Sequence, residues 1–436
     1  ASASAGGASG GASGGAGGRS SDASSDEGDK GGKELHDAVV SGGASAVASY
    51  GLRCFVSHAT VEDEGAVLGV GVNVTKTGSD GSIQGADLVL DVLSLDAFVT
   101  HRVRSGAWNE RFDNFLPLVL SPEHAERAAP CIVAALTDLD RGSTDCLTRA
   151  AHRLASSRGV DGVRSGAGAA SAADVDVNMV LRVLPALMNA MVVGLVDFGA
   201  GGSAGVSRRA SERALRGYCS LHHILLWLAR ANPELRREAS RIVSDFRDHP
   251  ASRTKRVTPN LGTLLVLMTI ADVEWPTVAV AFMREVFDRN VMWLLRKRPD
   301  LDVDTAAGGP DVDLDRLRAS FECCATSARV VMFQTTFLAL VGRPAGASPA
   351  DVLARYDASL GQPSAEQAAA LHAACKEIEA VDSYGGYFPR CGLRAPTPAQ
   401  VTRMLREAVV NSAAKGYHRR GGRDGRGGGG GGRGGG

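Results

Sequence analysis

From residue 175 to residue 415, apolar residues recur at steps of three and four, and this recurrence constrains the fold more than any other feature of the chain. Such spacing puts the apolar side chains on one face of an α-helix. Cap and break signals divide the stretch. Asn232 precedes Pro233 and Glu234 where a helix is expected to restart, and His249-Pro250 marks its end. The sequence therefore predicts an irregular α-helical domain or a solenoid-like stack, without a fixed repeat period.

The same reading gives the individual helices of this region. They are expected over 179–196, 213–229 with Ser211 as cap, 260–271, 277–297 and 314–342, with shorter ones after Ser348-Pro349, Ser364 and Thr397-Pro398. Segment 179–196 is too short and too polar for a good membrane span, which favours a buried helix. The predicted core comprises Leu181, Leu184, Leu187, Leu221, Leu225, Leu228, Ile242, Phe246, Leu265, Phe282, Phe287, Trp293, Phe333 and Phe337.

The region before it has a different pattern. Residues 67–75 alternate like a β-strand, and residues 86–98 are typical of a second strand that runs into a short helix capped by Ser94. Two further helices are expected, one starting at Pro122 and one after Ser143. This region is predicted to be a small α+β module.

The fold class predicted for the whole chain is mainly α, a small α+β N-terminal module followed by an irregular α-helical domain, with disordered Gly-rich tails at both ends. The expected segments are a disordered Gly/Ala/Ser linker at 1–48, the α+β module at 49–155, a linker at 156–174, the α-helical domain at 175–415 and a disordered Arg/Gly-rich tail at 416–436.

Composition narrows the class of protein. Hydrophobic residues make up 44% of the chain, which is enough for a packed core, and the formal net charge is zero. The molecule as a whole therefore has no electrostatic bias toward nucleic acid or a membrane. The 8 cysteines form no C-x-x-C pair and no compact disulfide framework, and the chain starts at Ala1 without a secretory leader. Reduced thiols and a cytoplasmic or nuclear location are expected, and the missing initiator Met suggests a processed chain or a fragment.

Cys219, His222 and His223 stand together in the apolar stretch 213–229. On a helix, Cys219 shares one face with His222 and another with His223, and two such side chains can hold one zinc ion. A structural zinc site needs four ligands, however, and no second clustered pair is visible. The favoured prediction is the buried face of a helix.

Two other groups of residues could in principle be catalytic or bind a metal, but their spacing favours a structural role. Cys323 and Cys324 are adjacent, so on a helix they point about 100° apart and share no metal-binding edge. Glu285 and Arg289 are four residues apart, the ordinary spacing of a helical ion pair. Buried thiols and a salt bridge are predicted rather than a catalytic cysteine or an acid–base pair of carboxylates.

Common cofactor motifs are missing from the sequence. It contains no P-loop, no H-E-x-x-H and no zinc knuckle, and the glycines of 69–78 lack the dinucleotide-binding spacing. No catalytic, metal-binding or cofactor-binding residues and no cofactor are predicted.

The C-terminal segment has a direct physical consequence. Arginines separated by glycines form a flexible cation that can follow a phosphate backbone and stack on bases. The candidate RNA-binding residues are Arg419, Arg420, Arg423, Arg426 and Arg433. Tyr417 is the only aromatic residue nearby, so the segment is expected to bind RNA weakly and without sequence preference; compositional drift explains it equally well.

Three stretches, 69–128, 213–236 and 258–293, resemble an uncharacterised accessory region of multidomain ubiquitin-conjugating (UBC-like) proteins of protists and giant viruses. The resemblance covers roughly residues 50 to 418. It implies a non-catalytic part, because the family's catalytic core needs a His-Pro-Asn motif before its cysteine. Here the only His-Pro is followed by Ala251. Any ubiquitin transfer would then need an upstream core.

The sequence thus predicts a non-catalytic interaction scaffold, accessory to a ubiquitin-conjugating protein. A protein partner is expected, with ubiquitin-pathway components as candidates, and no membrane contact; the oligomeric state is open. The alternative is an RNA-associated protein that binds nonspecifically through its C-terminal Arg/Gly tail.

Overall fold

The computed structural model describes residues 51–63, 66–77, 83–95, 115–141, 171–196, 204–302 and 313–417. The expected N-terminal linker, the helix after Ser143 and residues 418–436 of the expected tail lie outside the described residues. Of the expected linker at 156–174, residues 171–174 are described. Ala172–Asp174 form a short 3-10 helix, η2, whose Ala172 is buried.

A four-stranded sheet forms the first layer. It consists of β1 (Gly51–Asp63), β2 (Ala66–Thr77), β3 (Ile83–Leu93) and β4 (Phe115–Pro117), in the order β1-β2-β3-β4. The first three strands are antiparallel, and β4 pairs parallel to β3. The strands expected at 67–75 and 86–98 correspond to β2 and β3, whereas β1 and β4 were not predicted.

One helix accompanies the sheet. α3 (Pro122–Arg141) begins with proline at its first position, as predicted, and the Ser121 hydroxyl accepts a hydrogen bond from the His124 backbone N–H (3.3 Å). Proline suits this position because the first amides of a helix have no partner within it. Leu116, Ile132 and Leu136 are fully buried, so α3 and β4 contribute to the core.

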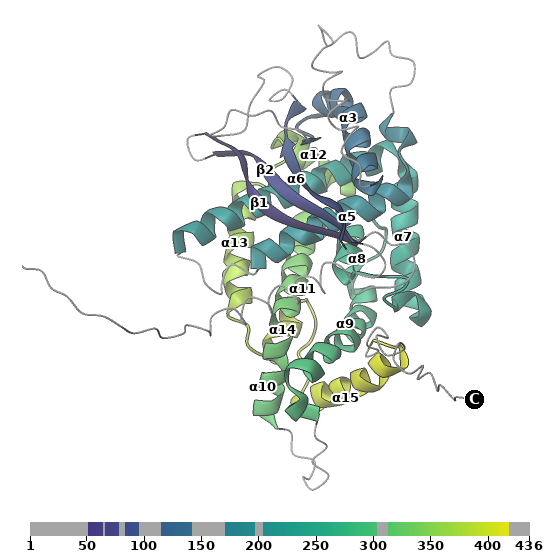
Figure 1. Cartoon of the computed structure of the whole chain (residues 1–436), viewed down its shortest axis with the longest axis vertical. Helices are drawn as coiled ribbons and strands as arrows, with labels where there is room; N and C mark the ends of the chain where they lie inside the picture. Colours follow the sequence, from purple (N-terminus) through teal and green to yellow (C-terminus); the bar gives the residue numbers. More distant parts are fainter. Residues whose placement is uncertain are drawn as a thin grey trace, which may run out of the picture.

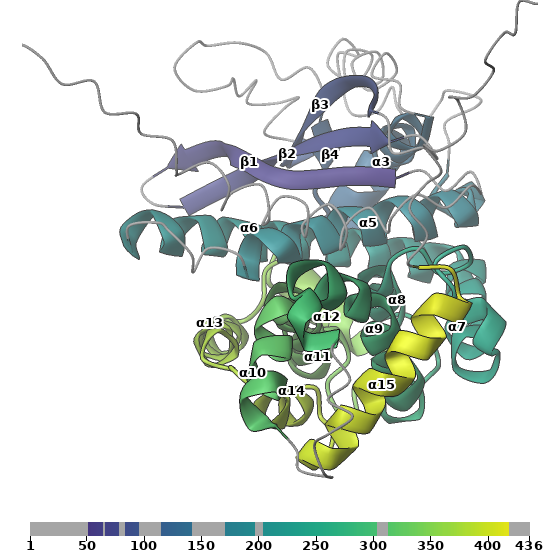
Figure 2. The same ribbon diagram turned by 60° about the horizontal axis from the view of Figure 1, so that its bottom comes forward.

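Two long helices, α5 (Val177–Val196) and α6 (Ala204–Ala231), form the next layer, between the sheet and the remaining helices (Figure 2). α5 matches the buried helix predicted over 179–196. α6 contains the predicted helix over 213–229 but starts at Ala204, so Ser211 is not its cap. Serine is a frequent N-cap residue, but here the helix continues through Ser211.

The remaining elements follow as helices of varied length (Figure 1). They are α7 (Pro233–Asp248), η3 (Pro250–Arg253), α8 (Leu261–Leu267), α9 (Trp275–Lys297), η4 (Pro299–Asp302), α10 (Leu314–Cys323), α11 (Ala325–Phe337), η5 (Leu338–Gly342), α12 (Pro349–Ala358), α13 (Ala365–Glu379), α14 (Tyr384–Arg390) and α15 (Pro398–Ala414). Predicted caps hold several of them. The Asn232 side chain caps α7, and Ser348, Ser364 and Thr397 form capping boxes for α12, α13 and α15.

The single helix predicted over 314–342 was wrong. The backbone leaves helical geometry at Cys324 (φ −109°, ψ 5°), which separates α10 from α11, and α11 ends in a π-helical turn, η5. No Pro or Gly marks the break, so the pattern of apolar residues continues across it. α14 was also not predicted, because its sequence YGGYFPR combines two glycines and a proline.

Buried side chains connect the layers. One continuous hydrophobic cluster extends from Val92 of β3 to Ala408 of α15. Twelve of the fourteen predicted core residues are buried; Ile242 and Trp293 are only partly buried. The prediction of a mainly α fold with a small α+β N-terminal part is confirmed for the described residues.

One described segment meets the simple criteria for a membrane span. Ala325–Gly342, which comprises α11 and η5, is long and apolar enough to cross a bilayer by length and composition. In the structure 61% of this segment is buried against the rest of the chain. Its apolar character is therefore used within the core.

Candidate functional site

His222 and His223 lie on the buried part of α6, as predicted, and both are fully buried. Their partners come from α12, on the other side of the helical layer. His222 Nδ1 lies 3.1 Å from the Tyr356 hydroxyl, and His223 Nε2 lies 2.9 Å from Asp357 Oδ1. The two rings therefore join α6 to α12, 134 positions later in the chain.

Burial controls the protonation of both histidines. Burial, together with a smaller effect of the charge of His223, lowers the pKa of His222 to about 3. Burial also lowers the pKa of His223, opposed by its hydrogen bond to Asp357. His222 is consequently neutral at pH 7. Cys219, on the same helix, has its thiol pKa raised by burial to about 12. Cys219 and His222 are thus part of the core rather than a nucleophile and base.

The described chain assembles no metal centre from its His, Cys, Asp and Glu side chains, in groups of three or more. Six thiols are free, and four of them are buried; the six are Cys131, Cys219, Cys323, Cys324, Cys375 and Cys391. Burial raises the pKa of Cys131, Cys324 and Cys391 to about 12 and that of Cys375 to about 11, and it also raises the pKa of Cys323.

The ion pair predicted at Glu285 and Arg289 is present on α9 and is buried. Arg289 Nε donates to Glu285 Oε1 (2.9 Å), and the Glu285 side chain has no exposed surface. The other guanidinium nitrogens donate to the backbone carbonyls of Pro259 (3.0 Å), Thr258 (2.6 Å) and Arg253 (2.8 Å). Arg289 therefore closes the loop before α8 onto α9.

The C-terminal end of the described chain completes this cluster. Lys415 Nζ donates to Glu285 Oε2 (2.5 Å) and to Asp288 Oδ2 (2.7 Å). The Tyr417 hydroxyl donates to Glu285 Oε1 (2.7 Å), and Asn411 Nδ2 donates to Asp288 Oδ1 (3.3 Å). Burial raises the pKa of Asp288, opposed by the hydrogen bond from Lys415. We call Glu285, Asp288, Arg289, Lys415 and Tyr417 the C-terminal clasp. It holds α15 against α9 (Figure 2).

Lys255 lies beside the clasp. Its ammonium group is 5.0 Å from the centre of the Tyr417 ring and 3.6 Å from Met292 Sδ. The pKa of Lys255 is lowered to about 8, mainly by burial and also by the charge of Arg289, against the opposing charge of Glu285. Within the described residues, no carboxylate comes within ion-pair distance of this ammonium group.

Lys255 lines a small hollow between the loop before α8 and helices α9 and α11. The volume of the hollow is about 60 Å³. Its polar lining includes Arg289, Asn290, Ser327 and Gln334. Asn290 Nδ2 donates to Ser327 Oγ (3.1 Å), and Gln334 Oε1, almost completely buried, has no hydrogen-bond partner. Polar groups with unused hydrogen-bonding capacity therefore line a space large enough for a small ligand.

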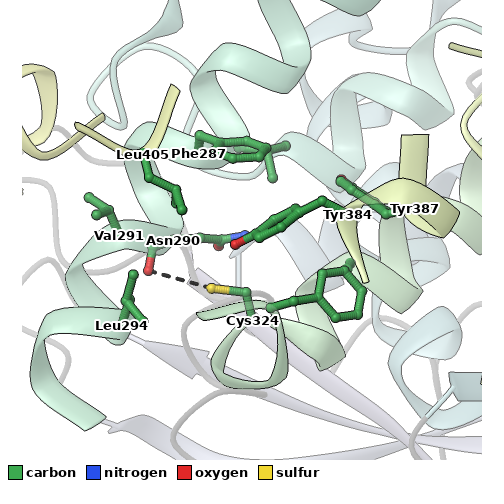
Figure 3. A pocket seen from close by; sticks show the side chains of 11 residues that line it. Phe287, Asn290, Val291, Leu294, Cys324, Tyr384, Tyr387 and Leu405 are labelled. Atoms are coloured by element: carbon green, nitrogen blue, oxygen red, sulfur yellow. Dashed lines mark hydrogen bonds between the residues drawn. The ribbon is translucent and has the colours of Figure 1, made fainter. Parts of the chain in front are cut away.

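A neighbouring hollow, shown in Figure 3, has an apolar lining. Aromatic rings of Phe287, Tyr384 and Tyr387 surround it, and Cys324 Sγ points toward the carbonyl oxygen of Asn290 at 3.9 Å. Its volume is only about 20 Å³, enough for on the order of one or two water molecules. This space is a packing defect at the kink between α10 and α11 rather than a ligand site.

The largest of the three hollows opens between α11, α13 and the start of α9, with a volume of about 490 Å³. Trp275 lies on one side, and its indole Nε1 donates to the Cys391 carbonyl oxygen (2.8 Å). Ala370, Ala373 and Ala374 on α13 line the facing side. The hydrogen bond fixes the indole ring, and the small alanines leave room in front of it.

The candidate RNA-binding residues Arg419, Arg420, Arg423, Arg426 and Arg433 lie outside the described residues. The sequence predicted the Glu285–Arg289 pair but missed Lys415, Tyr417 and Lys255. Local spacing carries no information on partners more than 100 positions apart. The acidic pair Glu285 and Asp288, among the large apolar residues of α9, was the available signal that a cation besides Arg289 must meet them.

No protein-family model, no curated protein and no solved structure matches this chain. The resemblance to the accessory region of ubiquitin-conjugating proteins therefore stays a prediction.

Proposed function

We propose that this chain serves as a non-catalytic interaction scaffold, accessory to a ubiquitin-conjugating protein. The hollow beside Trp275 is the observation that supports it. Tryptophan residues are frequent energetic centres of protein interfaces, and a ring that is already fixed loses little entropy on binding. Ala373 is exposed at the rim, so a partner side chain can approach the backbone of α13 closely.

The chemistry of the thiols supports the non-catalytic part of the proposal. Ubiquitin transfer through a thioester needs a thiolate nucleophile. Burial raises the pKa of the six free thiols named above, those of Cys219 and Cys324 to about 12. Reduced, protonated thiols also suit the cytoplasmic or nuclear location predicted from the sequence.

The test combines thioester formation with binding. The chain is incubated with activating enzyme, ubiquitin, ATP and a separate conjugating enzyme, then analysed on non-reducing gels and by chemical crosslinking. We expect no reducible ubiquitin adduct on this chain, and a crosslink to the conjugating enzyme that Ala373→Arg weakens. The exposed Ala413→Arg, on α15, serves as the control. A ubiquitin adduct that disappears with reductant would contradict the proposal.

Association with RNA through residues 418–436 is the second candidate. The C-terminal clasp supports it, because Lys415 and Tyr417 fix the chain immediately before the arginine-rich segment. Tyr417, the last described residue, contacts Lys255, and Arg256 next to it is exposed, so the folded body carries cations close to the residue that precedes the arginine-rich segment. A polyanion could contact both.

Salt dependence tests this candidate. Binding to a single-stranded RNA of 20 uridines should weaken steeply as salt rises, with about 0.7 counterions released per phosphate contact. Replacing Arg419, Arg420, Arg423, Arg426 and Arg433 with serine should remove most of the affinity and flatten the slope. Fluorescence anisotropy at several salt concentrations measures both. Unchanged affinity in the serine variant would exclude the segment as the source of binding.

A further inference from the structure

Lys255 is a cation held in place without an anionic partner. Its backbone N–H donates to the Tyr417 hydroxyl (3.1 Å), so the C-terminal clasp fixes its position. The ammonium group keeps only weak partners, the Met292 sulfur and the Tyr417 ring. Keeping a charge partly buried costs free energy unless an anion compensates for it. The structure therefore holds a cation ready for an anion that the described chain does not supply.

The charges around the hollow have a positive balance. Arg289 and Arg296 on α9 act on Lys255 with the same sign, and Glu285 opposes them. Arg289 and Lys415 already neutralise the Glu285 carboxylate. Burial raises the pKa of Tyr417, so this phenol is neutral at pH 7. The α11 side contributes Ser327 and Gln334, which carry no charge. An anion entering the hollow meets net positive charge.

Size and donor geometry favour one kind of anion. The hollow has a volume of about 60 Å³, enough for roughly four to six water molecules. A tetrahedral oxyanion has a similar size. A planar carboxylate is best bound by an arginine fork, but four of the five N–H groups of Arg289 already donate to Glu285 and to three carbonyls, which leaves no pair of parallel donors. The hollow instead offers a point charge, Lys255, and the Ser327 hydroxyl. Lysine binds phosphate in this way, as a point charge.

We propose that the hollow between the loop before α8 and helices α9 and α11 is a binding site for a phosphoryl group, with Lys255 as the charged ligand and Ser327 as a hydroxyl donor. Gln334 Oε1 accepts from a protonated phosphate oxygen or a bound water. Trp293, stacked under the Arg296 guanidinium at 5.2 Å, stands at the edge, where the group attached to the phosphate would leave. The site consists of the folded body alone and does not depend on residues 418–436.

The first experiment titrates the full chain with inorganic phosphate by calorimetry. We expect saturable binding that Lys255→Met weakens by about tenfold or more, the loss of one charge-assisted hydrogen bond. Lys297→Met, which removes an exposed cation at the end of α9 that does not line the hollow, should bind as the unchanged chain does. Equal affinity in the Lys255→Met variant, or no binding by the unchanged chain, would overturn the proposal.

A second measurement needs no variant. Phosphate should slow acetylation of Lys255 by an amine-reactive ester, followed by mass spectrometry, and should leave acetylation of Lys297 unchanged. Because burial lowers the pKa of Lys255 to about 8, phosphate affinity should also fall as pH rises above that value. Phosphate is already dianionic at this pH, so the loss of affinity would result from deprotonation of Lys255. Equal acetylation rates with and without phosphate would contradict the assignment even if the Lys255→Met variant failed to fold.

Two further arms separate the sources of the phosphoryl group. Adenosine monophosphate represents a small molecule, and a 20-uridine RNA represents a polymer, each tested on the chain with the five serine substitutions in its C-terminal segment. If Lys255→Met weakens RNA binding in that background, the site takes a backbone phosphate. If it weakens binding of the monophosphate and of phosphate but not of RNA, the site takes a free phosphoryl compound. Both outcomes support the site, and RNA binding through the segment is measured independently.

Discussion

Replacing Arg289 with methionine is expected to lower the free energy of unfolding by about 3 kcal/mol, because it leaves a buried carboxylate and three backbone carbonyls with fewer donors. The Glu285 side chain has no exposed surface, and the Arg289 side chain is only 9% exposed. Methionine fills much of the same volume, so the loss reports charge and hydrogen bonds rather than a cavity. Lys415 and Tyr417 still contact Glu285, which limits the loss.

Urea denaturation followed by circular dichroism measures this effect. Arg284→Met is the matched control, since Arg284 lies on the same helix and is exposed. Its effect should stay within about 0.5 kcal/mol. If both variants lost the same stability, the clasp would contribute no more than any surface arginine. A loss confined to α15, seen as faster amide exchange there, would show that the clasp holds this helix without stabilising the whole body.

The sequence predicted those contacts of the clasp whose two residues are close in the chain, and it did not predict those whose residues are far apart. The spacing of Glu285 and Arg289 predicts their ion pair, because i and i+4 meet on any helix. Lys415 and Tyr417 are 130 and 132 positions from Glu285, and their contact depends on how α15 packs against α9. For the same reason the helical face with His222 was predicted, whereas its partner Tyr356 was not.

The break at Cys324 shows a different limit. The apolar pattern predicts which side chains are buried, and Phe321, Phe333 and Phe337 on both sides of the break are buried. The pattern does not reveal that the single residue Cys324 leaves helical geometry, because the spacing of apolar residues continues unchanged after it. Cap residues predicted several helix starts correctly, although the cap predicted at Ser211 was wrong. Ser348, Ser364 and Thr397 each start a helix as predicted, since their side chains bond the free amides of the first turn.

Substituting Gly262 with alanine is expected to destabilise the fold by about 3 kcal/mol, although alanine has the higher helix propensity by about 1 kcal/mol. A Cβ at Gly262 would stand 1.7 Å from Asn189 Oδ1 and 3.1 Å from Gln334 Nε2. These two buried amides bond each other at 3.0 Å, and Gln334 Nε2 also donates to the Gly262 carbonyl oxygen at 3.2 Å. The methyl group would push the Asn189 amide away and break the bond between α5 and α11.

Gly385→Ala provides the control, because the nearest atom that its Cβ would meet is Ser383 Oγ at 3.9 Å. There, alanine should be neutral or stabilise the helix by up to about 1 kcal/mol. A double-mutant cycle then isolates the clash. Asn189→Ala removes the obstructing oxygen, so Gly262→Ala should cost at least about 1 kcal/mol less in that background, measured by urea denaturation. Additive effects would mean that the loss arises elsewhere, because a clash between two side chains requires that removing one relieves the other.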